Sequence, residues 1–148
     1  MQRFSGSLEA VPDGFTASLV TLSEDGWPTT SLLGPGELYA PDNGHVALAL
    51  WPGSRAQRNM LRTGRAGLDF VADGRFYQLR LTQLHSREVD GLVLIQTTLN
   101  GGEAQSVPYA QLTNGIQYVL QDPLASLTRW ATQKGSLRSF AHTPFDPT

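Results

Sequence analysis

The most chemically suggestive feature of the chain is a cluster of four arginines within eleven positions: Arg55, Arg58, Arg62 and Arg65. Their spacings of three, four and three predict that all four guanidinium groups share one side of a helix. Ala56, Met60 and Thr63 fall roughly opposite and are expected to face a core. Like charges at these spacings oppose helix formation, so the pattern indicates that an anion compensates them.

The same segment has a start signal that suits anion binding. Ser54 follows Pro52 and Gly53 and is predicted to cap the helix. Backbone N–H groups at a helix start attract a phosphate. The segment therefore predicts a site for a phosphate-bearing ligand, and the competing interpretation is an ordinary solvated helix face.

Composition limits the class of protein. The 148 residues are long enough for one domain, 1–148, with a substantial core. The net charge of −2 disfavours a general binder of nucleic acid or of membrane surfaces. The absence of cysteine excludes disulfides and thiolate chemistry, and no apolar run is long enough to span a bilayer. We expect a cytoplasmic protein that binds neither nucleic acid nor membrane.

No metal site is expected. The three histidines, His45, His85 and His142, are scattered and lack the spacing of metal ligands.

Short segments rich in β-formers, separated by turn residues, predict many strands. Before the arginine cluster, strands are expected at 15–23, 27–33 and 45–51, with a turn at 24–26 and breaks at 34–36 and 41–44. After it, strands are expected at 67–72, 75–87, 92–99 and 115–121, with a loop at 100–103. Gly64 is expected to end the arginine-bearing helix. A C-terminal helix is expected from Pro123, capped by Asp122, with a frayed tail at 143–148.

This order predicts a mainly β fold. Six or seven sequential strands, with one internal and one terminal helix, are typical of an antiparallel barrel. The arginine-bearing helix is placed between strands 3 and 4. Trp27 and Trp51 are expected to be buried at strand ends, and Trp130 to lie in the core.

Several of these pieces together resemble one family, the FMN-binding split β-barrels related to pyridoxamine 5′-phosphate oxidase. The resemblance covers residues 15 to about 85. Its motifs here are Gly26-Trp27-Pro28 at a strand start, Ser54-Arg55, a helical Asn59, Gly64-Arg65 and Phe70. It implies an antiparallel split barrel that binds FMN and forms a homodimer.

The resemblance also implies a set of cofactor-binding residues. The flavin phosphate would be held by Trp51, Ser54 and Arg55, with Arg58 and Asn59 one turn further on. The edge of the isoalloxazine ring would lie along Thr30, Ser31, Leu32 and Leu33. Gln78 would reach the flavin across the dimer interface.

The chain departs from the family pattern in two places. Ala56 stands where the family commonly has lysine, so Arg58 or Arg62 is expected to supply the missing charge. Residues 139–148 lack the Arg- and Trp-bearing segment with which pyridoxamine-phosphate oxidases hold their substrate. We therefore expect an FMN-dependent oxidoreductase acting on an unidentified small molecule. The alternatives are a non-catalytic flavin- or haem-binding module and a split-barrel dimer that has lost its cofactor.

Overall fold

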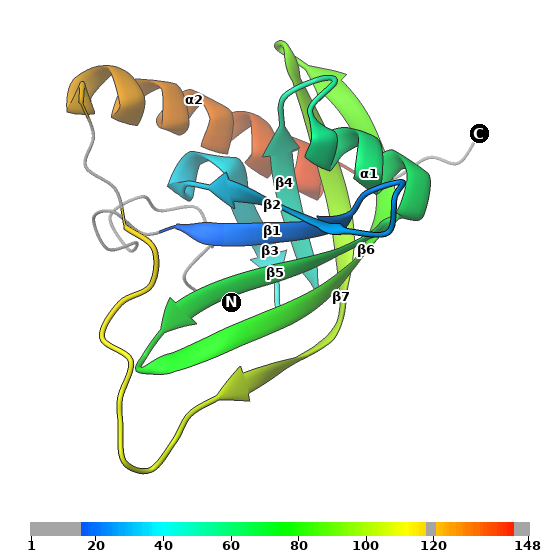
Figure 1. The fold of residues 1–148 in the computed structure, drawn as a ribbon. Coiled ribbons are helices and arrows are strands. Elements are labelled where there is room, and N and C mark those ends of the chain that lie inside the picture. The colour runs from blue at the N-terminus through cyan, green and yellow to red at the C-terminus, as the bar shows by residue number, and fades with distance from the viewer. Residues whose placement is uncertain (1–15, 118–120, 144–148) are drawn as a thin grey trace.

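A computed structural model of the protein describes residues 16–117 and 121–143. They form one seven-stranded antiparallel sheet in the order β2-β1-β5-β6-β7-β4-β3, with two α-helices and a short 3₁₀ helix, η3. The strands are β1 (Ala17–Leu22), β2 (Pro28–Leu33), β3 (Leu38–Asp42), β4 (His45–Leu50), β5 (Arg65–Ala72), β6 (Arg75–Val89) and β7 (Leu92–Gln105). The helices are η3 (Pro35–Glu37), α1 (Arg55–Thr63) and α2 (Pro123–His142). The predicted β-rich antiparallel fold is confirmed (Figure 1).

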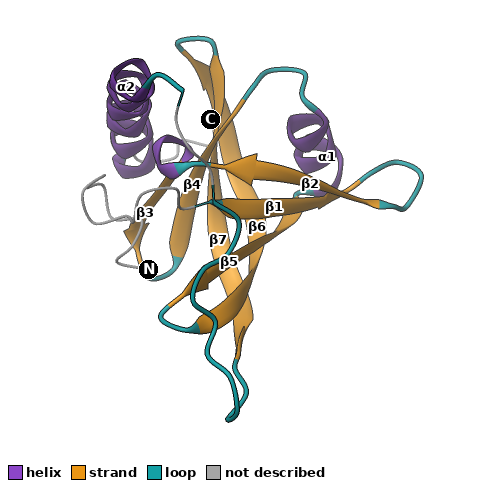
Figure 2. Ribbon diagram, turned by 60° about the vertical axis from the view of Figure 1, so that its left-hand side comes forward, coloured by secondary structure: helices purple, strands orange, loops and turns teal. Residues whose placement is uncertain are grey.

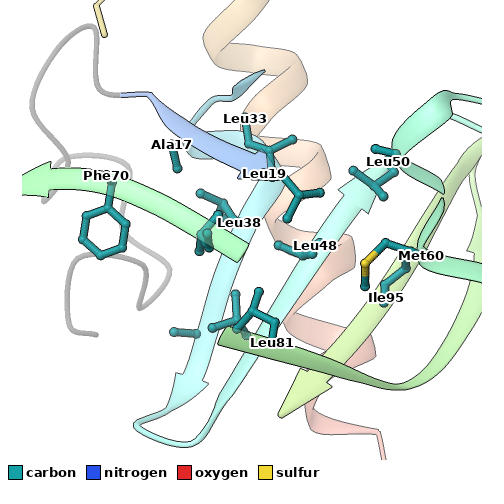
Figure 3. Packing of buried hydrophobic residues seen from close by; sticks show 14 of the residues in the cluster. Ala17, Leu19, Leu33, Leu38, Leu48, Leu50, Met60, Phe70, Leu81 and Ile95 are labelled. Carbon is teal, nitrogen blue, oxygen red and sulfur yellow. The ribbon is translucent and has the colours of Figure 1, made fainter. Parts of the chain in front are cut away.

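The main core lies on the inner face of the curved sheet. Alternate residues of each strand point inward, so Leu19, Leu48 and Leu68 are fully buried. Met60 of α1 joins this cluster from the helix side (Figure 3). The prediction that Ala56 and Met60 face the core is therefore confirmed.

The predicted position of α1 is wrong by one strand, because α1 lies between β4 and β5. No strand was expected at β3, which contains Pro41 as its next-to-last residue before a turn. Proline lacks the N–H of a central strand, but an edge strand tolerates it. β3 is one edge of the sheet and pairs only with β4 among the described strands.

The predicted loop at 100–103 is also wrong, because β7 runs through it. The strand register shifts opposite Leu79 and Leu81, which marks a bulge. A Cβ on Gly102 would lie 2.5 Å from the backbone oxygen of Gln78, so glycine permits this close approach.

The predicted strand at 115–121 is not found at 115–117 or at 121. Residues 118–120 lie outside the described residues, as do 144–148 of the predicted tail. The two tryptophans expected to be buried, Trp27 and Trp51, are instead 73% and 61% exposed. Each follows a turn or precedes one, at a strand end that no described element covers.

Helix α2 covers the opposite face of the sheet beside β3, β4 and β7 (Figure 2). Asp122 caps it as predicted, accepting a hydrogen bond from the Ala125 amide at 3.2 Å. Leu137 and Phe140 pack in a second apolar cluster, and Trp130 is buried as expected. Neither helix in the described part of the chain is long and apolar enough to cross a membrane.

One charged side chain is buried beneath α2. Lys134 is 3% exposed, and its Nζ donates hydrogen bonds to the backbone oxygens of Pro35, at 3.1 Å, and Leu38. Burial lowers the pKa of Lys134 to about 8, and the charge of Arg138 adds to the shift. The buried cation therefore costs stability at neutral pH.

We predict a pH-dependent difference in stability between the wild-type protein and Lys134→Met. From about pH 8 to pH 10.5 the folded protein has lost this proton while the unfolded chain still holds it. The free energy of unfolding of the wild type should therefore rise relative to the variant, by up to about 3 kcal/mol across this window. Urea unfolding of both proteins at several pH values measures the difference, and parallel profiles would contradict the assignment.

Candidate functional site

The N-terminus of α1 is built as the sequence predicts. Ser54 is in an extended conformation, and its Oγ accepts a hydrogen bond from the Gln57 amide at 3.2 Å. The Gln57 side chain accepts from the Gly53 amide, also at 3.2 Å. Gly64 ends the helix in the left-handed conformation, with φ of 68°. These contacts fix the direction in which the first helical turn points.

The arginine cluster divides into three parts. Arg55 and Arg58 are exposed on α1, and neither forms a salt bridge with a carboxylate in residues 16–117 or 121–143. Arg62 instead donates to the backbone oxygen of Leu22, at the end of β1. Arg65 is the first residue of β5, so the prediction that it shares the helix is wrong. Two guanidinium groups near the helix start therefore remain available to an anion.

Asn59 is buried, at 5% exposure, and it connects α1 to the sheet. Its Nδ2 donates to Thr21 Oγ1 at 3.0 Å, and its Oδ1 accepts from Arg62 at 3.3 Å. These bonds place α1 beside the turn between β1 and β2 (Figure 1). A direct contact of Asn59 with a phosphate stays a prediction, and its observed role is to position the helix.

Strand β2 forms the other edge of the sheet, and within the described residues no strand lies on its far side. Trp27 O accepts from Ser23 N, which sets the ladder between β1 and β2. Alternation along that ladder turns the N–H and C=O groups of Thr30 and Leu32 away from β1. These two residues therefore offer backbone donors and acceptors at the sheet edge.

The four residues predicted along β2 divide between two faces. Thr30 and Leu32 are exposed on the outer face, whereas Ser31 and Leu33 point toward the core, with Leu33 fully packed. The backbone groups of Ser31 and Leu33 also face β1, so they are used in the pairing of the two strands. The structure thus brings part of this predicted set together and turns the rest inward.

Cross-strand pairing links these positions to a groove on the outer face. One row runs from Thr30 through Val20 and Gly67 to Arg80. The neighbouring row runs from Leu32 through Ser18, Asp69 and Gln78 to Glu103. The groove has a volume of about 260 Å³ and is lined by Val20, Gly67, Asp69, Gln78, Leu79, Arg80 and Glu103. Gln78, predicted from the sequence, therefore shares a face with Thr30 and Leu32.

Glycine makes the floor of this groove. A Cβ on Gly67 would meet its nearest neighbours only at 3.8–3.9 Å, so the space above it is open. Asp69 and Gln78 stand beside it on adjacent strands, and Gln78 Oε1 accepts from Gln105 Nε2 at 2.9 Å. Burial raises the pKa of Asp69, although a hydrogen bond from Gln78 opposes the rise. The groove combines apolar walls with hydrogen-bonding groups and charges of both signs.

The site prediction did not include Gly67, Asp69, Arg80 or Glu103. The signal for Asp69 was present as a polar residue between the inward-facing Leu68 and Phe70. Alternation alone places such a residue on the outer face, but only the pairing of β5 with β6 brings it beside Gln78. Among the described residues, no group of three or more potential metal ligands is found.

Two places in this arrangement could each hold one polar end of a nucleotide cofactor. The capped start of α1, with Arg55 and Arg58, suits a phosphate. The outward backbone groups of Thr30 and Leu32 complement the alternating donors and acceptors of a pyrimidine edge. Ala56 is buried against the core, so its replacement by lysine would not simply add a ligand there.

Comparison with known proteins gives one related sequence and a group of similar folds. No family model matches the chain. The chain is 30% identical over 117 residues to the uncharacterized protein YclD of Bacillus subtilis strain 168. The matched region covers 76% of this chain and 75% of YclD.

Similar solved structures, at low sequence identity, include proteins whose names refer to a flavin or to pyridoxamine 5′-phosphate oxidase. An FMN-binding protein from Syntrophomonas wolfei matches with a TM-score of 0.56 and 8% identity, over 72% of this chain and 86% of its own. The styrene monooxygenase flavin reductase of Pseudomonas putida S12 matches at 0.54 and 12% identity, over 64% and 82%. A pyridoxamine 5′-phosphate oxidase-like protein from Lactobacillus delbrueckii matches at 0.52 and 15% identity, over 60% and 84%.

The sequence likeness and the shared arrangement of strands lead to one assignment. The chain belongs to the same family as YclD, and it has the split-barrel fold of the FMN-binding proteins related to pyridoxamine 5′-phosphate oxidase.

Proposed function

We propose that the protein is an FMN-dependent oxidoreductase. The observation that carries this proposal is the capped start of α1, with Arg55 and Arg58 free of salt bridges among the described residues, on the same sheet as the open edge of β2. The flavin reductase and the FMN-binding protein among the similar folds support the choice of cofactor. A bound flavin would supply the redox chemistry, and the protein would bind and orient it.

Each part of the site has a separate task in this proposal. Arg55 neutralises the phosphate, together with the Ser54 segment and Arg58. The backbone of Thr30 and Leu32 holds the pyrimidine edge. The groove over Gly67 receives the small-molecule substrate, where Asp69 and Gln78 offer hydrogen bonds.

We further propose that the protein acts as a homodimer. Leu22, Trp27 and Leu32 expose apolar surface on or beside the outer face, at 50%, 73% and 55%. A second copy placed against this face would bury that surface and bring the partner's Gln78 toward the flavin. A cytoplasmic location stays a prediction from the sequence.

Replacing the phosphate-binding arginine should weaken FMN binding selectively. We expect Arg55→Ala to lose about 1.5–3 kcal/mol of binding free energy, which raises the Kd about 10- to 150-fold, because a charged hydrogen bond is lost. Arg65→Ala is the matched control, since Arg65 is equally exposed but begins β5. Fluorescence titration with FMN gives both constants, and equal weakening in the two variants would place the phosphate elsewhere.

The purified protein should be yellow, and reduced pyridine nucleotide should remove its visible flavin absorbance under anaerobic conditions. A yellow protein that neither NADH nor NADPH bleaches would instead favour a non-catalytic flavin carrier. A colourless protein that ignores added FMN would overturn the proposal. Absorbance spectra of the isolated protein, followed by stopped-flow mixing, distinguish these outcomes.

Filling the groove should block turnover without removing the cofactor. Gly67→Val is expected to fold, because valine favours strands and the added Cβ meets only ordinary contacts. We expect flavin reduction by the better pyridine nucleotide to slow by about tenfold or more, since access is obstructed. FMN affinity should stay close to that of the wild type. An unchanged reduction rate would show that the groove is not the substrate site.

A further inference from the structure

Helix α2 packs closely against the segment that connects β2 to β3. Trp130 covers this connection so closely that a Cβ on Gly36 would lie 2.3 Å from ring carbons of the tryptophan. A Cβ on Gly34 would lie 3.0 Å from the same ring. A side chain at Gly36 would therefore clash with the indole, one at Gly34 would crowd it, and the ring rests directly on the backbone of η3.

Lys134 holds the same connection one helical turn further along α2. Its ammonium group donates hydrogen bonds to the backbone oxygens of Pro35, the first residue of η3, and of Leu38, the residue that follows η3. Trp130 and Lys134 thus form a clasp, the name used below for these two side chains around residues 34–38. The clasp joins a C-terminal helix to the end of the edge strand β2.

Charged groups surround the clasp from each element that packs there. Glu37 of η3 is partly buried, and its Oε1 lies 3.5 Å from the Gly34 amide as a hydrogen-bond acceptor. Burial raises the pKa of Glu37, while the Gly34 amide and the charge of Arg129 oppose the rise. Arg138, on α2, lies near Lys134 and destabilises its charge.

The buried ammonium group of Lys134 does not by itself increase the stability of the fold. Removing an ammonium group from water is costly, and the shifted titration of Lys134 shows that the cost is only partly offset here. Its two bonds instead fix the positions of two specific carbonyl groups. This points to a role in geometry, at the place where β2 ends.

Strand β2 needs such a support because it is paired on one side only. β1 holds it through the register from Ala17 with Leu33 to Leu22 with Pro28. Beyond Leu33 that pairing stops, and the next residue, Gly34, already lies under Trp130. The clasp begins two residues after Leu32, whose outward backbone groups belong to the proposed flavin edge.

We propose that Trp130 and Lys134 are positioning residues that hold the C-terminal end of β2 in the conformation that binds the flavin ring. This inference rests on the proposed function for its ligand, but the effect on β2 itself does not require a ligand. Both side chains contact residues 34–38, and they act on β2 through this segment.

The test compares Lys134→Met with Leu137→Ala. Leu137 lies on the same helix but packs in the second cluster with Tyr39, Ala47 and Leu94, so its truncation lowers stability away from η3. Amide hydrogen exchange reports β2 without any ligand. The Ser31 and Leu33 amides, which face β1, should exchange about tenfold faster in Lys134→Met and remain unchanged in Leu137→Ala.

FMN affinity gives the second measurement on the same proteins. We expect Lys134→Met to raise the Kd for FMN about tenfold. This is the lower end of the loss in affinity seen when a residue that orients a ligand-binding group is replaced. Leu137→Ala should keep the wild-type Kd despite its lower stability. If Lys134→Met does not fold, we use Trp130→Phe instead, which removes the part of the indole ring that lies over Gly34.

The outcomes separate the two proposals. A wild-type protein that does not bind FMN overturns the proposed function, while faster exchange of β2 in the clasp variant would still support positioning. Unchanged exchange in Lys134→Met and Trp130→Phe overturns the clasp, whether or not FMN binds. Equal changes in the clasp variants and in Leu137→Ala also overturn it, because they would reflect stability alone.

Discussion

The site depends on the position of β2 at the edge of the sheet. The backbone groups of a central strand form hydrogen bonds with two neighbouring strands. Among the described strands, β2 is bonded only to β1. That leaves the backbone of Thr30 and Leu32 free to meet a ligand. An exposed edge is also a liability, because it can pair with another chain. Here the glycine-rich turn into η3, covered by α2, ends the edge after only six residues.

Helix α1 places the positive charges of its arginines beside the sheet. Its arginines are tolerated because Ala56 and Met60 bury the other side of the helix, and because Asn59 and Arg62 tie it to β1. Within the described residues, Arg55 and Arg58 form no salt bridge that would hold the helix in place. The helix is therefore held by packing and by the hydrogen bonds of Asn59 and Arg62, and its first turn stays open to an anion.

Much of the fold could be predicted because its signals are local. Turn residues such as Asp73-Gly74 and Asp90-Gly91 mark the hairpins, and the caps of both helices are short-range contacts. The failures occurred where tertiary context overrode a local rule. Pro41 is permitted in β3 by its edge position, and β7 continues through Asn100 and Gly101 as a bulge between the pairs that Leu99 and Gly102 form with β6.

The candidate site shows the same limit. The four positions on β2 were implied by the family resemblance, and the structure divides them between two faces. The sequence itself predicted the start of α1 from its capping residue and spacing. It could not identify the groove, since Gly67 and Glu103 lie on strands β5 and β7 and meet only through the pairing of each with β6.

By itself, then, the sequence determined most of the strands, the caps and a positively charged helix, all of which depend on neighbours within a few positions. Tertiary structure alone decided which strand is an edge, which arginines stay unpaired, and that Lys134 reaches residues almost a hundred positions away. Those features arise from hydrogen bonds and packing between distant segments, and no local pattern in the chain specifies their partners.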